Sequence, residues 1–257
     1  MDVMSSFSLA GKKAVVTGGS SGLGAAAAQA LAQAGADIAV ADIDGGEADS
    51  IIAKINDLGR RAIFIRTDVS MARQVEKMVA QVKHEFKGID ILVTSAGVGK
   101  KVAAEYLAAQ EWEQVMAVNL KGVFLCCQKV GREMIRRKSG SIVNISSMSG
   151  TIVNKDRKIS AYCASKGGVI MLTKSLATEW ARYNVRVNSI APGYFTTPFN
   201  DKWMADPAMS EAALELTPMK RFAAPEEIGP AAVFLASGAA SFITGHILLV
   251  DGGYTAW

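Results

Sequence analysis

Short apolar runs and longer segments of helical period alternate along the whole chain. The short runs are rich in Val and Ile and almost continuously apolar, as expected of strands buried on both faces of a sheet. The longer segments repeat their apolar positions every three to four residues, which is the period of a helix that covers a sheet. The runs predict seven strands, at residues 14–17, 37–42, 62–66, 89–94, 141–145, 186–190 and 247–250.

Helices are predicted in the segments between these strands. They are expected at residues 23–34, 46–58, 72–86, 108–137, 161–183 and 225–237, the fourth being broken near Asn119. Alternation of strand and helix favours parallel strands joined by right-handed crossovers. Residues 1–257 are therefore predicted to form a single α/β domain, a Rossmann-type, doubly wound parallel sheet of seven strands with helices on both faces.

One long stretch, residues 191–224, follows neither pattern. It holds four of the chain's six prolines, Pro192, Pro198, Pro207 and Pro218. Irregular segments of this length inside a compact domain are usually lids or binding loops. We predict that this stretch is a substrate lid.

Composition and charge narrow the class of protein. Of the 257 residues 50% are hydrophobic and 20% charged, which is enough apolar material for one large core. The net charge is +4, and the longest basic run is the short segment 136–138, which argues against nucleic acid as the main partner.

Cysteine spacing and hydropathy indicate a soluble cytoplasmic protein. The three cysteines, two of them adjacent at Cys126 and Cys127, have neither the spacing of a metal site nor the pattern of a disulfide framework. Residues 1–11 lack the apolar core of a signal peptide, and the apolar stretch 230–250 is interrupted by glycine and polar residues. We expect no metal and no membrane partner.

A glycine-rich turn joins the first predicted strand to the first helix. It reads Gly18-Gly19-Ser20-Ser21-Gly22-Leu23-Gly24. Glycines allow a tight turn and let backbone N–H groups approach a pyrophosphate at the positive end of the helix. A tight strand-to-helix connection without a ligand is an equally simple explanation of the turn alone.

The second predicted strand ends in an acidic residue, which favours the nucleotide interpretation. Asp42 falls close to the position, roughly 20 residues beyond such a turn, where a carboxylate accepts hydrogen bonds from the adenosine ribose. A carboxylate repels a 2′-phosphate, and no Arg or Lys stands in the turn or directly after Asp42. NAD(H) is therefore predicted in preference to NADP(H).

Two further predicted strands end in residues that suit a ligand site. Asp68-Val69 and Ala96-Gly97 close the third and fourth strands at carboxyl ends, where ligands bind in such sheets, although turn chemistry explains them as well. Nucleotide binding by itself selects no reaction, because the fold serves many functions.

Tyr162 and Lys166 are four residues apart and share one face of a predicted helix. A tyrosine has a pKa of roughly 10, too high for a base at neutral pH, and a neighbouring ammonium group lowers it. Taken alone, a packed ring and a solvated amine explain the pair better. Ser147 follows the fifth predicted strand, where its hydroxyl could hydrogen-bond an alcohol or carbonyl oxygen, unless it is simply a loop serine.

In combination and order these motifs resemble the short-chain dehydrogenase/reductase family over residues 9–253. The matching pieces are the glycine turn, Asp68, Ala96-Gly97, Asn119, Ser147, Tyr162 with Lys166, and Pro192-Gly193 with Thr197. Two departures accompany them. Ser95 stands where the family usually has Asn, and Ser147 stands 15 residues before Tyr162, slightly farther than is commonest in the family, so that Ser149 is a rival for the serine role.

The resemblance implies an oxidoreductase that interconverts a secondary alcohol and a ketone. Tyr162 would exchange a proton with the substrate oxygen, and Ser147 would position that oxygen. Lys166 would lower the pKa of Tyr162 and hold the nicotinamide ribose, while Asn119 would bind a water linking Lys166 to solvent. The implied cofactor contacts are Gly18, Ser20, Ser21, Gly22, Leu23, Gly24, Asp42, Asp68, Val69, Ala96, Gly97, Tyr162, Lys166, Pro192, Gly193 and Thr197.

The segment 251–254 resembles the sugar and polyol branches of the family, and the polar loop Asn154-Lys155-Asp156-Arg157-Lys158 could meet such a substrate, although a solvated loop explains it too. A sugar, sugar acid or polyol is therefore the predicted substrate. The alternatives are an NADPH-dependent 3-oxoacyl (acyl carrier protein) reductase and a non-catalytic nucleotide-binding regulator. The resemblance also implies a homotetramer built on the helices at 108–137 and 161–183, together with the last helix and strand.

Overall fold

The computed structural model describes residues 2–155 and 157–257. Seven parallel strands form one sheet in the order β3-β2-β1-β4-β5-β6-β7, which confirms the predicted fold class. The strands are β1 (Lys13–Thr17), β2 (Asp37–Asp42), β3 (Ala62–Arg66), β4 (Ile91–Thr94), β5 (Gly140–Ile145), β6 (Val185–Pro192) and β7 (Ile247–Val250).

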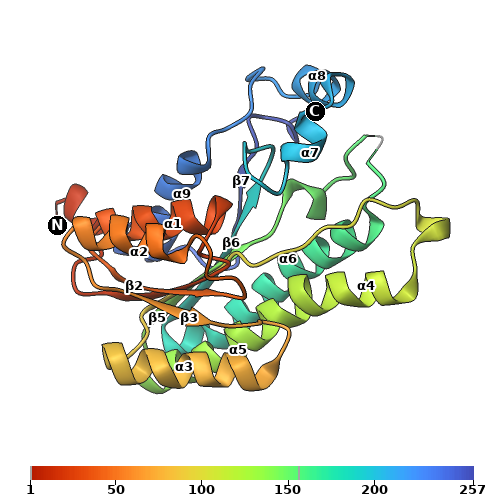
Figure 1. Ribbon diagram of the computed structural model, residues 1–257. Coiled ribbons are helices and arrows are strands. Elements are labelled where there is room, and N and C mark those ends of the chain that lie inside the picture. Colours follow the sequence, from red (N-terminus) through yellow and green to blue (C-terminus); the bar gives the residue numbers. More distant parts are fainter. Residues whose placement is uncertain (1, 156) are drawn as a thin grey trace.

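Helices cover both faces of this sheet (Figure 1). They are α1 (Gly22–Gln33), α2 (Ala48–Asp57), α3 (Ala72–Phe86), α4 (Ala109–Met116), α5 (Val123–Arg137), α6 (Ser160–Trp180), α7 (Asp201–Met204), α8 (Pro207–Glu215) and α9 (Gly229–Ala236). Short 3-10 turns lie at Met4–Phe7, Ala104–Tyr106, Met148–Gly150, Ala181–Tyr183, Pro225–Ile228 and Gly238–Ala240. None of the helices described is long and apolar enough to cross a membrane.

Two apolar cores lie on opposite sides of the sheet. Side chains alternate along a strand, so neighbours in β1 point to opposite faces: Val16 packs with α1 and α9, and Val15 packs with α3 and α5. Burial on both faces explains why the strands are almost continuously apolar in the sequence.

The strand order reverses between β1 and β4. From β1 the chain adds β2 and β3 on one side, and β4 to β7 then follow on the other side of β1. In open α/β sheets a crevice forms at the carboxyl ends of the strands at such a switch point. The ends of β1, β2, β4 and β5 therefore lie around one crevice.

The prediction that residues 191–224 are irregular is wrong in part, because the segment contains α7 and α8. The Asp206 carboxylate accepts hydrogen bonds from the backbone N–H groups of Ala208 (3.1 Å) and Met209 (3.4 Å). Pro207 occupies the first turn of α8, where its missing N–H costs no helical hydrogen bond. The proline that marks a loop elsewhere therefore begins a helix here.

The predicted interruption near Asn119 is confirmed, although the helix is distorted rather than broken. Between α4 and α5 the chain forms a π-helix, Ala117–Gly122. Insertions of this kind often occur at functional sites because they shift a side chain out of the regular helical spacing. Asn119 in this segment is fully buried.

Candidate active site

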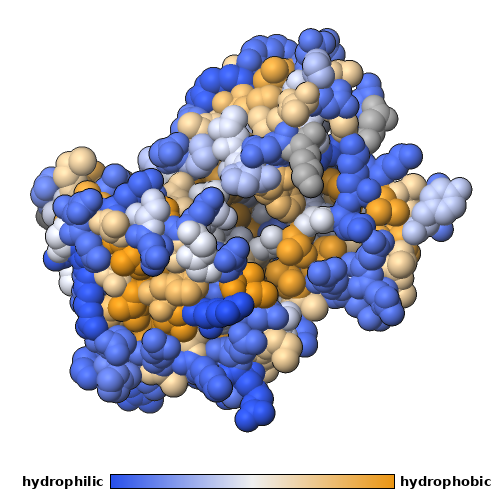
Figure 2. Space-filling view, viewed as in Figure 1, coloured by the Kyte–Doolittle hydropathy of each residue, from blue (hydrophilic) through white to orange (hydrophobic). Residues whose placement is uncertain are grey.

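A cavity of about 1000 Å³ opens at the carboxyl edge of the sheet. Its wall combines the turn after β1, the ends of β2, β4 and β5, the first turns of α6, and the segment 192–203. In the space-filling view the surface is hollowed beneath the α7–α8 segment, with apolar residues gathered along the hollow (Figure 2). The cavity is thus placed at the switch point of the sheet.

Close packing in the turn after β1 requires glycine. Gly18 has φ +65°, and a Cβ there would lie 2.6 Å from the backbone nitrogen of Ala96. A Cβ on Gly24 would lie 1.9 Å from the carbonyl oxygen of Gly18. The turn therefore has no side chains at these two positions, and it brings the N-terminus of α1 to the cavity, as a pyrophosphate site requires.

Asp42 is held at the rim of the cavity beside this turn. Its Oδ2 accepts a hydrogen bond from the backbone N–H of Ser20 (3.1 Å), and its Oδ1 accepts one from Ile43 (2.8 Å). The hydroxyl of Ser20 is buried and has no hydrogen-bond partner among the described residues. Ser20 thus orients Asp42 from behind the wall of the cavity.

Ser20 does not line the cavity, but all the remaining predicted cofactor contacts do. They are Gly18, Ser21, Gly22, Leu23, Gly24, Asp42, Asp68, Val69, Ala96, Gly97, Tyr162, Lys166, Pro192, Gly193 and Thr197. Side-chain-free backbone at one end, a carboxylate beside it and a buried lysine at the far end fit a nicotinamide dinucleotide. The described residues contain no group of His, Cys, Asp and Glu side chains that could hold a metal ion.

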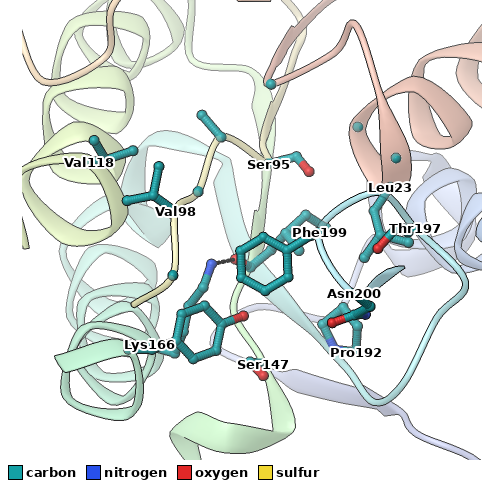
Figure 3. A pocket seen from close by; sticks show the side chains of 18 of the residues that line it. Leu23, Ser95, Val98, Val118, Ser147, Lys166, Pro192, Thr197, Phe199 and Asn200 are labelled. Atoms are coloured by element: carbon teal, nitrogen blue, oxygen red, sulfur yellow. Dashed lines mark hydrogen bonds between the residues drawn. The ribbon is translucent and has the colours of Figure 1, made fainter. Parts of the chain in front are cut away.

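Lys166 projects from α6 into the cavity and is only 4% exposed. Its Nζ donates a hydrogen bond to the carbonyl oxygen of Ile145 at the end of β5 (2.8 Å), which is the dashed line in Figure 3. Burial lowers the pKa of Lys166 to about 8. In the same view Phe199, from the segment after β6, lies beside Lys166, and Thr197 lies beside Leu23 of α1.

Tyr162 lies one helical turn before Lys166, whose Nζ is 5.7 Å from the centre of the tyrosine ring. Burial raises the pKa of the Tyr162 hydroxyl, and a hydrogen bond with the Ser147 side chain opposes this shift. The direction differs from the lowering by Lys166 that the family resemblance implies. Burial is the largest cause of the shift in the Tyr162 pKa, and Lys166, whose ammonium donates to a backbone carbonyl, is not among its causes.

The two candidate serines have different partners. The Ser149 hydroxyl donates to Oδ1 of Asn154, whereas the Ser147 side chain lies close enough to Tyr162 to lower the pKa of its hydroxyl. Ser147 also accepts a hydrogen bond from the backbone N–H of Ser149 (3.1 Å). Both serines line the cavity, but the contact with Tyr162 favours Ser147 as the serine that acts beside it.

Asn119 lies behind the wall of the cavity rather than in it. Its Nδ2 donates to the carbonyl oxygen of Val98 (2.9 Å) and to Oγ of Ser165 (3.1 Å), and its Oδ1 accepts from the backbone N–H of Val98 (2.8 Å). The side chain therefore ties the strand-end segment after β4 to α6. Of the four predicted catalytic residues, Ser147, Tyr162 and Lys166 therefore line the cavity, and Asn119 lies behind its wall.

Several lining residues escaped the sequence-based prediction. These are Tyr194, Phe199, Asn200 and Trp203 from the segment after β6. The available signal was the run of aromatic side chains within the proline-rich stretch. Aromatic residues outside the strand and helix patterns need another reason for their presence, and a binding surface is one. Of the polar loop 154–158, Asn154 and Arg157 reach the cavity, whereas Asp156 lies outside the described residues.

Comparison with known proteins gives matches over nearly the whole chain. A family model described as enoyl-(acyl carrier protein) reductase matches residues 18–255. The D-threitol dehydrogenase of Mycolicibacterium smegmatis is 45% identical over 97% of this chain and 95% of its own length. The galactitol 2-dehydrogenase (L-tagatose-forming) of Cereibacter sphaeroides is 44% identical over 100% of both chains.

Solved structures agree with this picture. A short-chain type dehydrogenase/reductase from Mycobacterium marinum superposes with a TM-score of 0.96 at 37% identity, covering 100% of both chains. A gluconate 5-dehydrogenase from Burkholderia cenocepacia J2315, in complex with NADP and tartrate, superposes with a TM-score of 0.95 at 37% identity, again over 100% of both chains.

Proposed function

The chain belongs to the short-chain dehydrogenase/reductase family and is an oxidoreductase of CH–OH groups, and on this premise we propose that it interconverts a secondary alcohol and a ketone on a sugar, sugar acid or polyol with NAD(H). The observation that carries the proposal is the meeting of Ser147, Tyr162 and Lys166 on the wall of the cavity that begins at the glycine turn. Relatives that act on threitol and galactitol support the substrate class.

Tyr162 is the residue that moves the proton. In oxidation the O–H proton of the alcohol passes to the Tyr162 oxygen while the C–H bond breaks, and its electron pair leaves with the hydrogen as hydride. The nicotinamide supplies the hydride acceptor when it is bound. In reduction Tyr162 returns the proton to the developing alkoxide. Ser147 holds the substrate oxygen by hydrogen bonding, and the nearby Lys166 cation stabilises the phenolate as it forms.

Asp42 supports NAD(H) as the preferred cofactor. Its carboxylate is held at the rim beside the glycine turn, where it can accept hydrogen bonds from ribose hydroxyls and would repel a 2′-phosphate. The B. cenocepacia relative was solved with NADP. The proposed preference for NAD(H) therefore rests on Asp42 of this chain and not on that relative.

A substrate panel tests the function. Polyols, sugar acids and keto sugars are offered with NAD(H) and with NADP(H), and absorbance of the reduced nicotinamide is followed. Turnover of at least one of these classes with NAD(H) is expected. Turnover confined to 3-oxoacyl thioesters with NADPH would replace the proposal by an acyl reductase, and binding of NADH without any turnover would indicate a regulator.

Residues 191–224 are proposed to act as a substrate lid. Phe199, Asn200 and Trp203 line the cavity from this segment, and Lys101 on another part of the wall donates to the Met209 sulfur in α8 (3.2 Å). We expect limited proteolysis within the segment to slow severalfold when cofactor and substrate are both added. Equal cleavage rates with and without the ligands would contradict a closing lid.

A homotetramer is proposed from an apolar surface where α4, α5 and α6 meet. It is formed by Trp112, Met116, Leu120, Phe124 and Leu172. Trp112 and Phe124 are each 39% exposed, which is unusual for large apolar side chains that cluster on one face. We expect Phe124→Glu to reduce the mass measured by light scattering from that of a tetramer, and Tyr106→Glu, outside this surface, to leave it unchanged. A wild-type monomer would overturn the proposal.

A cytoplasmic location is proposed as well. Cys126, Cys127 and Cys163 are all free thiols, which agrees with a reducing compartment. Fractionation of cells that produce the protein tests the location.

A further inference from the structure

The two ends of the cavity differ in charge. The lining carboxylates, Asp42 and Asp68, lie at one end, after β2 and β3, in the part that fits the adenosine half of the cofactor. The other end, beyond Tyr162, is cationic. The cationic lining residues are Lys100, Lys101, Arg157 and Lys166. Lys100 is neutralised by Glu111 (2.6 Å), and Lys166 is directed to the Ile145 carbonyl. Lys101 donates a hydrogen bond to the Met209 sulfur (3.2 Å). Arg157 is then the lining cation that has neither a partner nor an assigned role among the described residues.

Arg157 is held on an aromatic platform. Its guanidinium carbon lies 4.4 Å from the centre of the Trp203 ring and 6.0 Å from that of Tyr194. Both rings are themselves fixed, because the Trp203 indole N–H donates to Asn200 Oδ1 (2.8 Å) and the Tyr194 hydroxyl accepts from Asn154 Nδ2 (2.9 Å). Stacking occupies the faces of a guanidinium and leaves its in-plane N–H donors available to a ligand.

The donors of Arg157 are not used within the described part of the chain. Its Nε is buried and has no hydrogen-bond partner there, and none of the salt bridges among the described residues includes Arg157. A buried N–H of an ionised group without a partner is costly unless a ligand satisfies it. The charge also lies within reach of the reacting end, because it lowers the pKa of Tyr162.

We propose that Arg157, stacked on Trp203 and Tyr194, binds the terminal carboxylate of a sugar-acid substrate and so selects an aldonate over the corresponding neutral alditol. The inference rests on the proposed function and narrows its substrate class. A planar guanidinium matches the two oxygens of a carboxylate with parallel hydrogen bonds, whereas a hydroxyl group offers a single neutral acceptor. Arg157 is thus a specificity residue that takes no part in the transfer of the proton or the hydride.

Matched pairs of substrates that differ only at the terminal carbon test the proposal. D-gluconate is compared with D-glucitol, D-galactonate with galactitol, and threonate with threitol, each with NAD. We expect wild-type kcat/KM to favour the aldonate in the pair that is turned over best. Arg157→Gln is expected to lower kcat/KM for that aldonate by about 10- to 100-fold, the loss of hydrogen bonds to a charged group. The alditol should change by less than about threefold on the same scale.

The loss should appear mainly in KM, since an anchor away from the reacting carbon binds ground state and transition state alike. Lys158→Gln is the matched control, because it removes one positive charge from the same loop at an exposed position outside the cavity wall. Arg157→Lys keeps the charge without the planar fork and should retain part of the aldonate preference.

The outcomes separate this inference from the proposed function. Turnover of alditols but not aldonates by the wild type, or an equal loss for both in Arg157→Gln, would overturn the role of Arg157 and leave the function standing. A preference for D-glucitol 6-phosphate over D-gluconate would assign the site to a phosphate instead. Turnover of none of these compounds by the wild type would overturn the proposed function itself.

Discussion

Tyr162→Phe is expected to reduce kcat by about a thousandfold, within the usual range for loss of a general acid–base residue. The substitution removes only the hydroxyl that meets Ser147, and the ring contact with Phe199 (centroids 5.8 Å apart) can persist. Binding of NADH, followed by nicotinamide fluorescence, should therefore be retained. Tyr183→Phe, in the 3-10 turn after α6, is the matched control and should keep full activity.

The same residue sets the expected pH dependence. Oxidation requires Tyr162 without its proton, and burial raises the pKa of this hydroxyl. The kcat/KM for oxidation should therefore rise with pH through the alkaline range. Reduction requires the proton on Tyr162, so kcat/KM for reduction should decline as the pH rises. Lys166, the neighbour of Tyr162, has a pKa of about 8 and loses its own proton in the same range. An oxidation rate independent of pH, or a Tyr162→Phe variant with wild-type turnover, would exclude Tyr162 as the proton carrier.

Asp42→Ser is expected to lower the ratio of kcat/KM with NAD to that with NADP by about 100-fold, equivalent to about 2.7 kcal/mol. Two effects add in the same direction. The variant loses hydrogen bonds from a carboxylate to the ribose hydroxyls, and it no longer repels a 2′-phosphate. Steady-state kinetics with both cofactors measure the ratio.

Asp44→Ser provides the control for this change. Asp44 is an exposed aspartate two residues further on; its carboxylate accepts from the backbone N–H of Gly46 (3.0 Å) and does not line the cavity. It alters the same net charge at nearly the same place, so its cofactor ratio should match the wild type. An unchanged ratio in Asp42→Ser would show that other residues choose the cofactor.

The sequence by itself determined the layers of the fold and the glycine turn that lines one end of the cavity. Strand and helix periods are local properties, and burial of the sheet on both faces makes them strong. The glycine turn is equally local: Gly24 must be bare because it meets Gly18, six residues earlier in the same turn. For these features the pattern of neighbouring residues was sufficient.

Only the tertiary structure decided which side chains line the rest of the cavity. The choice between Ser147 and Ser149 depends on which hydroxyl meets Tyr162 and which meets Asn154. Asn119 lies behind the wall of the cavity, where its hydrogen-bond partners are on the segment after β4 and on α6.

The stacking of Arg157 on Trp203 joins the loop before α6 to the helix after β6. No local pattern encodes such a contact, since it forms only when the parallel strands bring their carboxyl ends to one edge. Periodicity fixes which face of an element is buried, and packing of distant elements fixes which side chains share a cavity.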